Sequence, residues 1–394
     1  MTAQRSPISS PVVLFSLGTL FHSAAVVLLQ ILALISQVPA DFGRFSALYL
    51  FFALSSSVAL SVVCEAWQRV RPSASWKEYS APLLYLSVSA GLLTGGVFSL
   101  FPGFEDLFIL GGVAVGFATY RTGARYFSMH ERDFKWILPA DIGGTVVLAA
   151  GWLIFLLAPN NFSPVALFSV WAASSLVGAM TSRPAAGYHP NRVPIWVKKH
   201  RQEIRTLLSD SLTLDASNIG TPYALIPILG VTGFGVYRAL SNISGPVKLL
   251  LAPIRPLFST VSPARFATFK SVGIFVGLAL IIGAVCFAAL QLLSLSQLSI
   301  GTLTALTDYI WQSSVFVAGT FLNGIYYLVA RTHFSRARLL AARAITSIVG
   351  ILFPRVGALL WGLDGAITMV TVATVVFAVT WIVLLFQQKE THVA

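Results

Sequence analysis

The sequence predicts an all-α integral membrane protein with about twelve transmembrane helices in two six-helix bundles. Three observations predict this fold class: an apolar composition, a succession of apolar segments of bilayer length, and a motif repeated half a chain apart. The 394 residues are 56% hydrophobic and only 10% charged, with a mean hydropathy of +0.80. Soluble domains carry about 25% charged residues, so this composition excludes an ordinary water-soluble fold.

The apolar segments have the length that a bilayer requires, about 20 residues per helix. The first is too long for the apolar core of a signal peptide and lacks a small-residue cleavage site, so we expect it to be a retained helix. The expected spans are 12–36, 44–66, 80–101, 106–128, 136–158, 162–181, 207–229, 233–256, 271–291, 306–330, 338–358 and 364–386.

The basic residues alternate with these spans. If the N-terminus is cytoplasmic, all but three of the 26 Lys and Arg residues fall on the cytoplasmic side, and the exceptions are Arg44, Arg238 and Arg355. This distribution follows the positive-inside rule and predicts that both termini are cytoplasmic. The net charge of +12 therefore indicates cytoplasmic loops and no nucleic-acid partner.

A repeated motif divides the chain into two halves. Phe42-Gly43-Arg44-Phe45 lies at the junction of the first and second spans, and Phe234-Gly235-Val236-Tyr237-Arg238 at the junction of the seventh and eighth. Six spans separate the copies, so the repeats are parallel, which is one of the two plans of transporters. We expect an N-terminal bundle over 1–181, a cytoplasmic amphipathic linker over 182–206, and a C-terminal bundle over 207–394. The linker alternates apolar and basic residues, which is typical of a helix on an anionic membrane surface with Trp196 at headgroup depth.

No motif of an enzyme, a metal site or a cofactor site occurs. G-x-x-x-x-G-K-[ST], H-E-x-x-H and G-x-S-x-G are all absent from the sequence, and the expected loops are too short for a catalytic domain. Cys64 and Cys286 lie in apolar runs and are expected to pack as small hydrophobic residues. The sequence thus predicts a protein that is not an enzyme and needs no cofactor or metal.

Cationic residues within the spans are the candidates for substrate binding, because charge is costly in hydrocarbon and marks functional positions. Arg121 and Arg125 are four residues apart and share one helix face, where they either meet an anionic substrate or set the topology. Arg238, Lys248 and Arg255 belong to the eighth span. Together they suit a lumen that holds phosphate or pyrophosphate, since Arg offers bidentate contacts and Lys a point charge.

Acidic and amide residues are candidates for coupling or for ion pairs. Asp215, with Asn218 three residues later, either binds a cation or proton or neutralises Lys248. Asp141 either serves in coupling or pairs with Arg121 or Arg125. We interpret His22 as a packing residue, with a proton relay as the alternative.

The chain resembles the multidrug/oligosaccharidyl-lipid/polysaccharide (MOP) exporter superfamily, and within it the polysaccharide exporters and O-antigen-type flippases. The segments that carry the resemblance are Val38–Phe45, Gly233–Leu240, Gly245-Pro246-Val247-Lys248 and Arg255-Pro256-Leu257, together with the basic segment between two six-helix halves. The resemblance implies a V-shaped pair of bundles that encloses a central cavity and works by alternating access in the bacterial inner membrane. It implies a polyprenyl-pyrophosphate-linked oligosaccharide as substrate, membrane lipids as surroundings, and glycan polymerases or glycosyltransferases as partners.

Three alternatives remain open from the sequence. A cation-coupled multidrug antiporter has the same fold, although the drug-exporting branch usually relies on acidic lumen residues. A membrane-embedded glycan polymerase or acyltransferase is disfavoured, because the longest expected external segment, 292–305, has no charge. A non-transporting scaffold of the same fold is the third.

Overall fold

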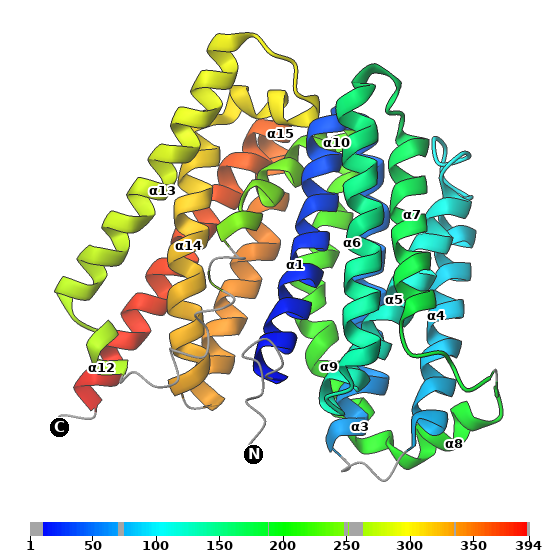
Figure 1. Ribbon diagram of the computed structural model, residues 1–394. Helices are drawn as coiled ribbons and strands as arrows, with labels where there is room; N and C mark the ends of the chain where they lie inside the picture. The colour runs from blue at the N-terminus through cyan, green and yellow to red at the C-terminus, as the bar shows by residue number, and fades with distance from the viewer. Residues whose placement is uncertain are drawn as a thin grey trace, which may run out of the picture. The chain divides into compact units, whose positions relative to one another are not determined.

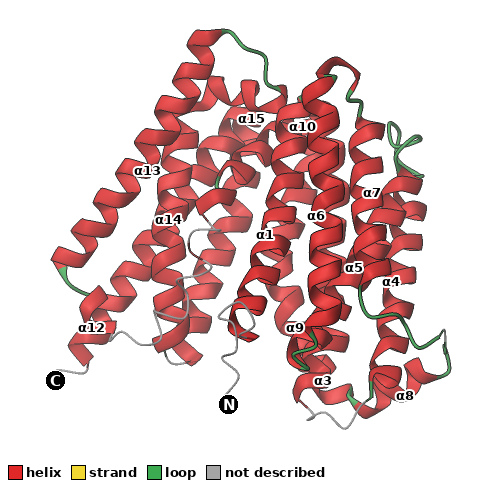
Figure 2. Ribbon diagram, viewed as in Figure 1, coloured by secondary structure: helices red, strands yellow, loops and turns green. Residues whose placement is uncertain are grey.

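The computed structural model describes residues 11–69, 75–187, 189–247, 251, 263–334 and 336–391. Throughout these ranges the chain is helical and forms no strand, as Figure 2 shows. Lys248 and Arg255 lie outside the described residues, so their expected roles stay predictions.

Twelve helical passages account for the described membrane segments, which confirms the expected count. Nine stretches within the described ranges are long and apolar enough to cross a membrane. Two of them contain a break: α10 (Thr221–Ile243) at Gly230, with φ 68°, and α15 (Arg336–Thr391) at Gly362, with φ 60°. Each therefore provides two passages, and the more polar α5 (Phe108–His130) is the twelfth.

The contacts between residues divide the chain into two compact units (Figure 1). Unit 1 comprises Met1–Ser36 and Arg44–Ile219, and unit 2 comprises Gln37–Gly43 and Gly220–Ala394. The division after Ile219 differs from the expected start of the second bundle at 207, because the segment between them extends a helix that packs on unit 1.

Unit 1 contains the first six long helices and the segment that follows them. Its elements are α1 (Pro11–Ser36), most of α2 (Pro39–Ala59), a π-helical segment (Leu60–Glu65), α3 (Ala66–Arg69), α4 (Trp76–Phe98), α5, α6 (Phe134–Leu157), a 3-10 turn (Pro159–Asn161), α7 (Pro164–Thr181), α8 (Arg192–Lys199), α9 (Arg201–Asp215) and a second π-helical segment (Ala216–Gly220). Within the unit, α4 packs on α5, α5 on α7, α7 on α6, and α6 on α1.

Small residues set the distance between α4 and α5. A Cβ atom on Gly91 would lie 2.8 Å from the carbonyl oxygen of Gly112, and a Cβ on Gly112 would lie 2.8 Å from that of Gly91. Helix interfaces in membranes rely on such small residues, because lipid offers no hydrophobic driving force and close van der Waals packing must replace it.

Aromatic residues form the core at one end of unit 1, where Trp67, Tyr79, Phe127 and Trp196 are buried together. Trp196 lies in α8, is only 4% exposed, and donates from Nε1 to the carbonyl oxygen of Val62 at 3.0 Å. The linker thus contains a helix, α8, and the Trp196 ring on it is packed within the protein; its expected depth at the headgroups stays a prediction. In this position the apolar ring is buried among other aromatic rings and its N–H has a hydrogen-bond acceptor, which explains why the side chain points into the protein.

Unit 2 contains α10, α12 (Pro263–Phe266), α13 (Phe269–Ser296), a 3-10 segment (Gly301–Tyr309), α14 (Ile310–His333) and α15. Within it α13 packs on α14, α14 on α15, and α15 on α10. The largest core cluster of this unit joins α13, α14 and the end of α15 through residues such as Tyr326 and Trp381.

The two copies of the repeated motif touch each other within unit 2. A Cβ on Gly235 would lie 1.9 Å from the carbonyl oxygen of Pro39 and 3.1 Å from the backbone nitrogen of Gly43. A Cβ on Gly43 would lie 2.2 Å from the carbonyl oxygen of Val231. Each glycine of the repeat therefore permits backbone-to-backbone contact with the other copy, which is a physical reason for Gly at both positions.

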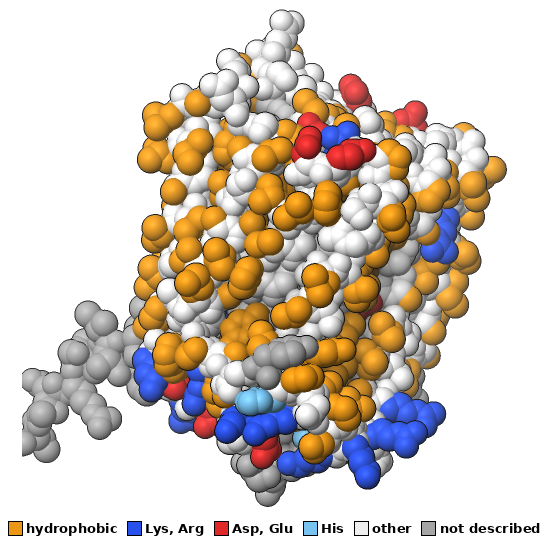
Figure 3. Space-filling view, turned by 90° about the vertical axis from the view of Figure 1, so that its right-hand side faces the viewer, with side chains coloured by type: hydrophobic (Ala, Val, Ile, Leu, Met, Phe, Trp, Pro, Cys, Tyr) orange, Lys and Arg blue, Asp and Glu red, His pale blue; other side chains and the backbone are white. Residues whose placement is uncertain are grey.

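Charged side chains gather at the two ends of the face seen in Figure 3. Most basic side chains lie at the lower end, acidic side chains lie at both ends, and apolar side chains cover most of the band between them. Exposed apolar residues of unit 1 include Leu92, Ile109 and Leu153, which are 72%, 64% and 56% exposed. A surface of this kind is stable in lipid and not in water, as a multi-pass membrane protein requires.

Candidate functional site

A buried ion cluster lies in the interior of unit 1. Arg121 and Arg125 extend from one face of α5 toward Asp141 of α6. Arg121 Nη2 lies 3.2 Å from Asp141 Oδ1, and Arg125 Nε lies 2.9 Å from Asp141 Oδ2. The Asp141 side chain is fully buried, while the two arginine side chains are 10% and 12% exposed.

Helix α1 completes the cluster. His22 Nδ1 lies 3.7 Å from Asp141 Oδ1, and Thr19 Oγ1 accepts a hydrogen bond from Arg125 Nη2 at 3.5 Å. The His22 side chain is 30% exposed, although its Nδ1 atom, which faces Asp141, is buried. Three helices, α1 and the consecutive α5 and α6, therefore supply its ionisable groups.

Two glycines make room for the Arg121 side chain. A Cβ on Gly144 would lie 2.5 Å from Arg121 Nη1, and a Cβ on Gly178 would lie 2.6 Å from Arg121 Cδ. Ser174 donates to the carbonyl oxygen of Gly144 at 2.8 Å, which ties α7 to α6 beside this space. Larger residues at either glycine would displace the guanidinium.

The cluster carries more positive than negative charge, since one carboxylate faces two guanidinium groups. Both carboxylate oxygens of Asp141 accept hydrogen bonds from the arginines. No described residue accepts a hydrogen bond from Arg121 Nε. Buried charge is costly unless it is fully paired. The arrangement can therefore bind a further anion, for which arginine donors are well suited.

The remaining predicted residues lie elsewhere. Arg238, in α10 of unit 2, is half-buried and acts electrostatically on Tyr223 and Tyr237. Asp215, at the end of α9, hydrogen-bonds Ser57. Asn218, in the π-helical segment that follows, is exposed. The contacts found for these residues do not join them to Asp141.

Sequence reasoning placed Arg121, Arg125 and Asp141 as candidates but did not assign His22, Gly144 and Gly178 to the same site. Asp141 is followed closely by Gly143-Gly144, which signals close packing against a neighbour in a membrane helix. Nothing in the sequence identifies that neighbour as an arginine. The rotation of α5 and α6 about their axes decides which residue lies there.

Solved structures resemble this chain over nearly its whole length. An inward-facing multidrug resistance transporter of the MATE family, in the MOP superfamily, matches with a TM-score of 0.65 at 12% identity, over 97% of this chain and 99% of that chain. The lipid II flippase MurJ in an inward closed conformation matches with a TM-score of 0.59 at 11% identity, over 94% of this chain and 87% of that chain. No family model and no curated protein sequence matches.

The chain therefore has the fold of the MOP transporters and is a multi-pass membrane protein. At 11–12% identity the likeness is one of fold, and one solved neighbour is a multidrug resistance transporter while the other is a lipid II flippase. The cargo of this chain must be argued from its own residues.

Proposed function

We propose that this protein is a flippase that moves a polyprenyl-pyrophosphate-linked oligosaccharide across the bacterial inner membrane by alternating access. The observation that carries the proposal is the buried cluster of two arginines around one carboxylate, because its excess charge is positive. A pyrophosphate that leaves water needs cationic hydrogen-bond donors to replace its hydration. The fold is consistent with this activity, since the lipid II flippase shares it.

A cation-coupled multidrug antiporter is the second candidate, and the MATE-family neighbour supports it through the shared fold. In this reading Asp141 would bind the coupling cation. Its oxygens lie 3.2 Å and 2.9 Å from two guanidinium groups, so a cation would have to displace an arginine from each oxygen it contacts. The cluster as it stands favours anionic cargo.

Reconstitution into liposomes distinguishes the two functions. A fluorescent polyprenyl-pyrophosphate oligosaccharide in the inner leaflet is protected from an impermeant quencher until it is flipped. We expect loss of protection with the parent protein and no accumulation of ethidium under a sodium or proton gradient. Ethidium transport without glycolipid movement would establish the antiporter instead.

Variants of Arg125 connect this activity to the cluster. Arg125→Gln keeps a polar side chain but removes the charge, and we expect it to slow flipping at unchanged protein abundance, with Arg125→Lys intermediate. Lys270→Gln, which removes an exposed cation at the start of α13, is the matched control. Equal flipping by parent and Arg125→Gln would remove the cluster from the mechanism.

The proposed orientation has both termini in the cytoplasm. Cysteine labelling in cells should then find 292–305 outside and 182–206 inside, after Cys64 and Cys286 are replaced. Partners that make or polymerise the glycan belong to this proposal, since a flippase needs an enzyme on each side of the membrane. Copurification of such enzymes from native membranes would support it.

A further inference from the structure

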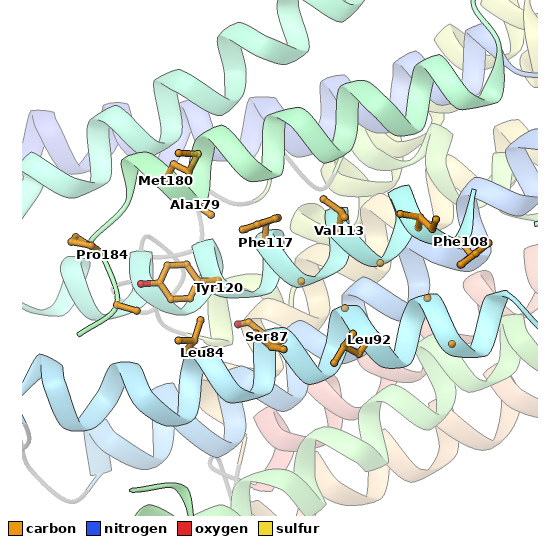
Figure 4. Close-up of a pocket in the computed structure, with 18 residues that line it drawn as sticks. Leu84, Ser87, Leu92, Phe108, Val113, Phe117, Tyr120, Ala179, Met180 and Pro184 are labelled. Atoms are coloured by element: carbon orange, nitrogen blue, oxygen red, sulfur yellow. The ribbon is translucent and has the colours of Figure 1, made fainter. Parts of the chain in front are cut away.

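A groove of about 670 Å³ runs along the surface of unit 1 between α4, α5 and α7 (Figure 4). Its lining is almost entirely apolar, with Val113, Phe117 and Met180 on its walls. Close packing of the glycines of α4 and α5 leaves a floor without side chains, which explains why the surface is hollow here. The volume lies within the range of ligand pockets.

The length of the groove matches one leaflet of a bilayer. It follows α4 from Leu84 to Gly96 and α5 from Phe108 to Tyr120. Twelve residues of helix span about 18 Å, while half of a bilayer core is about 15 Å. The groove ends at Gly96 and Phe108, near the end of α4 and at the start of α5, so a lipid chain of this length would fill it from Leu84 to that end.

One end of the groove is bordered by the segment after α7, which is held firmly in place. Tyr120 donates from its hydroxyl to the carbonyl oxygen of Arg183 at 2.7 Å, and Trp76 Nε1 donates to that of Pro184 at 2.7 Å. The Arg183 guanidinium lies 5.1 Å from the centroids of the Trp76 and Phe127 rings and 3.8 Å from Asp133. This end of the groove is therefore rigid.

The same end is cationic. Lys77 follows Trp76, and its carbonyl oxygen accepts a hydrogen bond from Arg192 Nη1 of α8 at 3.3 Å. Neither side chain has a carboxylate partner among the ion pairs of the described residues, whereas nearby Lys199 lies 3.8 Å from Glu78. Lys77 is exposed and Arg192 half-exposed, so both can reach a headgroup at the mouth of the groove.

We propose that this groove is a specific site for an anionic phospholipid, with an acyl chain along α4 and α5 and its phosphate at Lys77 and Arg192. Charge complementarity decides the occupant: an apolar channel about 18 Å long, with the cations of Lys77 and Arg192 beside one end, fits a lipid with a negative headgroup. A zwitterionic lipid would add a cation at that mouth and would lose this advantage. The site lies apart from the contacts of the ion cluster, so it does not depend on the transported cargo.

Native mass spectrometry of the full chain, released from detergent, tests the proposal. The probes are phosphatidylglycerol and phosphatidylcholine with identical acyl chains. We expect one retained phosphatidylglycerol per chain and much less phosphatidylcholine. Lys77→Gln combined with Arg192→Gln should weaken phosphatidylglycerol binding by about thirtyfold, since each basic residue near an anionic lipid surface contributes about 1 kcal/mol.

A second variant tests the groove itself. Gly96 lines the groove, and a Cβ there would meet no atom within 4 Å, so Gly96→Trp fills the channel without disturbing the packing of α4 on α5. We expect its phosphatidylglycerol retention to fall to the phosphatidylcholine level. Gly277→Trp on α13 is the matched control, because that glycine is equally unobstructed, and Lys270→Gln is the control for charge.

Three results would overturn the proposal. Equal retention of the two lipids would mean that the groove does not select charge. Parental retention in Gly96→Trp would mean that surface cations alone hold the lipid. Preferential retention of polyprenyl phosphate over phosphatidylglycerol would assign the groove to isoprenoid lipids.

Discussion

Asp141→Asn is the substitution that most directly tests the ion cluster of unit 1. The amide keeps the shape of the carboxylate but leaves Arg121 and Arg125 without their counter-charge, in a place where Asp141 is fully buried and both arginines are nearly so. Removing one partner of a buried ion pair costs about 3–5 kcal/mol. At roughly 2–4 °C per kcal/mol for a unit of this size, the melting temperature should fall by about 6–20 °C.

The assay is thermal unfolding in detergent, followed by tryptophan fluorescence, with a second variant that also removes one of the two cations. Asp141→Asn combined with Arg125→Gln should be less destabilised than the sum of the two single variants, because neighbours in one network couple. Asp364→Asn is the control: Asp364 accepts from the Tyr309 hydroxyl at 2.6 Å at an exposed position, so its loss should cost about 1 kcal/mol. If Asp141→Asn is no less stable than this control, the cluster is not a buried ion network and the reasoning fails.

Three further predictions concern other parts of the chain. Gly235→Ala should prevent the close contact with Pro39, where a Cβ would lie 1.9 Å from the carbonyl oxygen, and should abolish a stable monodisperse protein in gel filtration; a normal elution profile would contradict this. Trp196→Ala should lower the free energy of unfolding by about 3–5 kcal/mol, measured by thermal unfolding, and a cost below about 1 kcal/mol would show that α8 is not anchored by this ring. The hydrogen bond from the backbone N–H of Gly103 lowers the pKa of Glu105; this bond is therefore present above the ordinary pKa of a glutamate and is lost as the pH falls through the lowered value. Hydrogen exchange at the Gly103 amide, corrected for intrinsic rates, should lose protection over that range, and unchanged protection at low pH, or equal protection in Glu105→Gln, would refute the assignment.

The membrane passages could be predicted from sequence because hydrocarbon imposes a local rule. Every backbone polar group must be satisfied within the segment, so an apolar run of bilayer length becomes a helix. The passage expected at 136–158 is α6, Phe134–Leu157. The expected separations at 229–233 and 358–364 correspond to the breaks at Gly230 and Gly362, where positive φ angles interrupt otherwise continuous helices.

The sequence could predict the candidate site only as a set of ionisable residues whose placement in hydrocarbon is energetically costly. An ionisable group in a membrane helix signals a partner, and the sequence left open whether Asp141 pairs with Arg121, with Arg125 or with neither. The structure shows contacts to both and adds His22 from α1. A helix that is apolar on all sides has no distinct buried face, so its rotation cannot be obtained from periodicity.

The sequence by itself thus determined the number and approximate ends of the membrane passages. It also determined that ionisable side chains lie within those passages, where burial of charge costs free energy. Tertiary structure alone decided which charges meet, why the repeated glycines are required, and that Trp196 faces the protein. It also decided that α4 and α5 approach closely enough to leave a groove between them and α7. The physical reason is that burial in lipid acts on each segment separately, whereas ion pairs and close backbone contacts depend on which helix faces which.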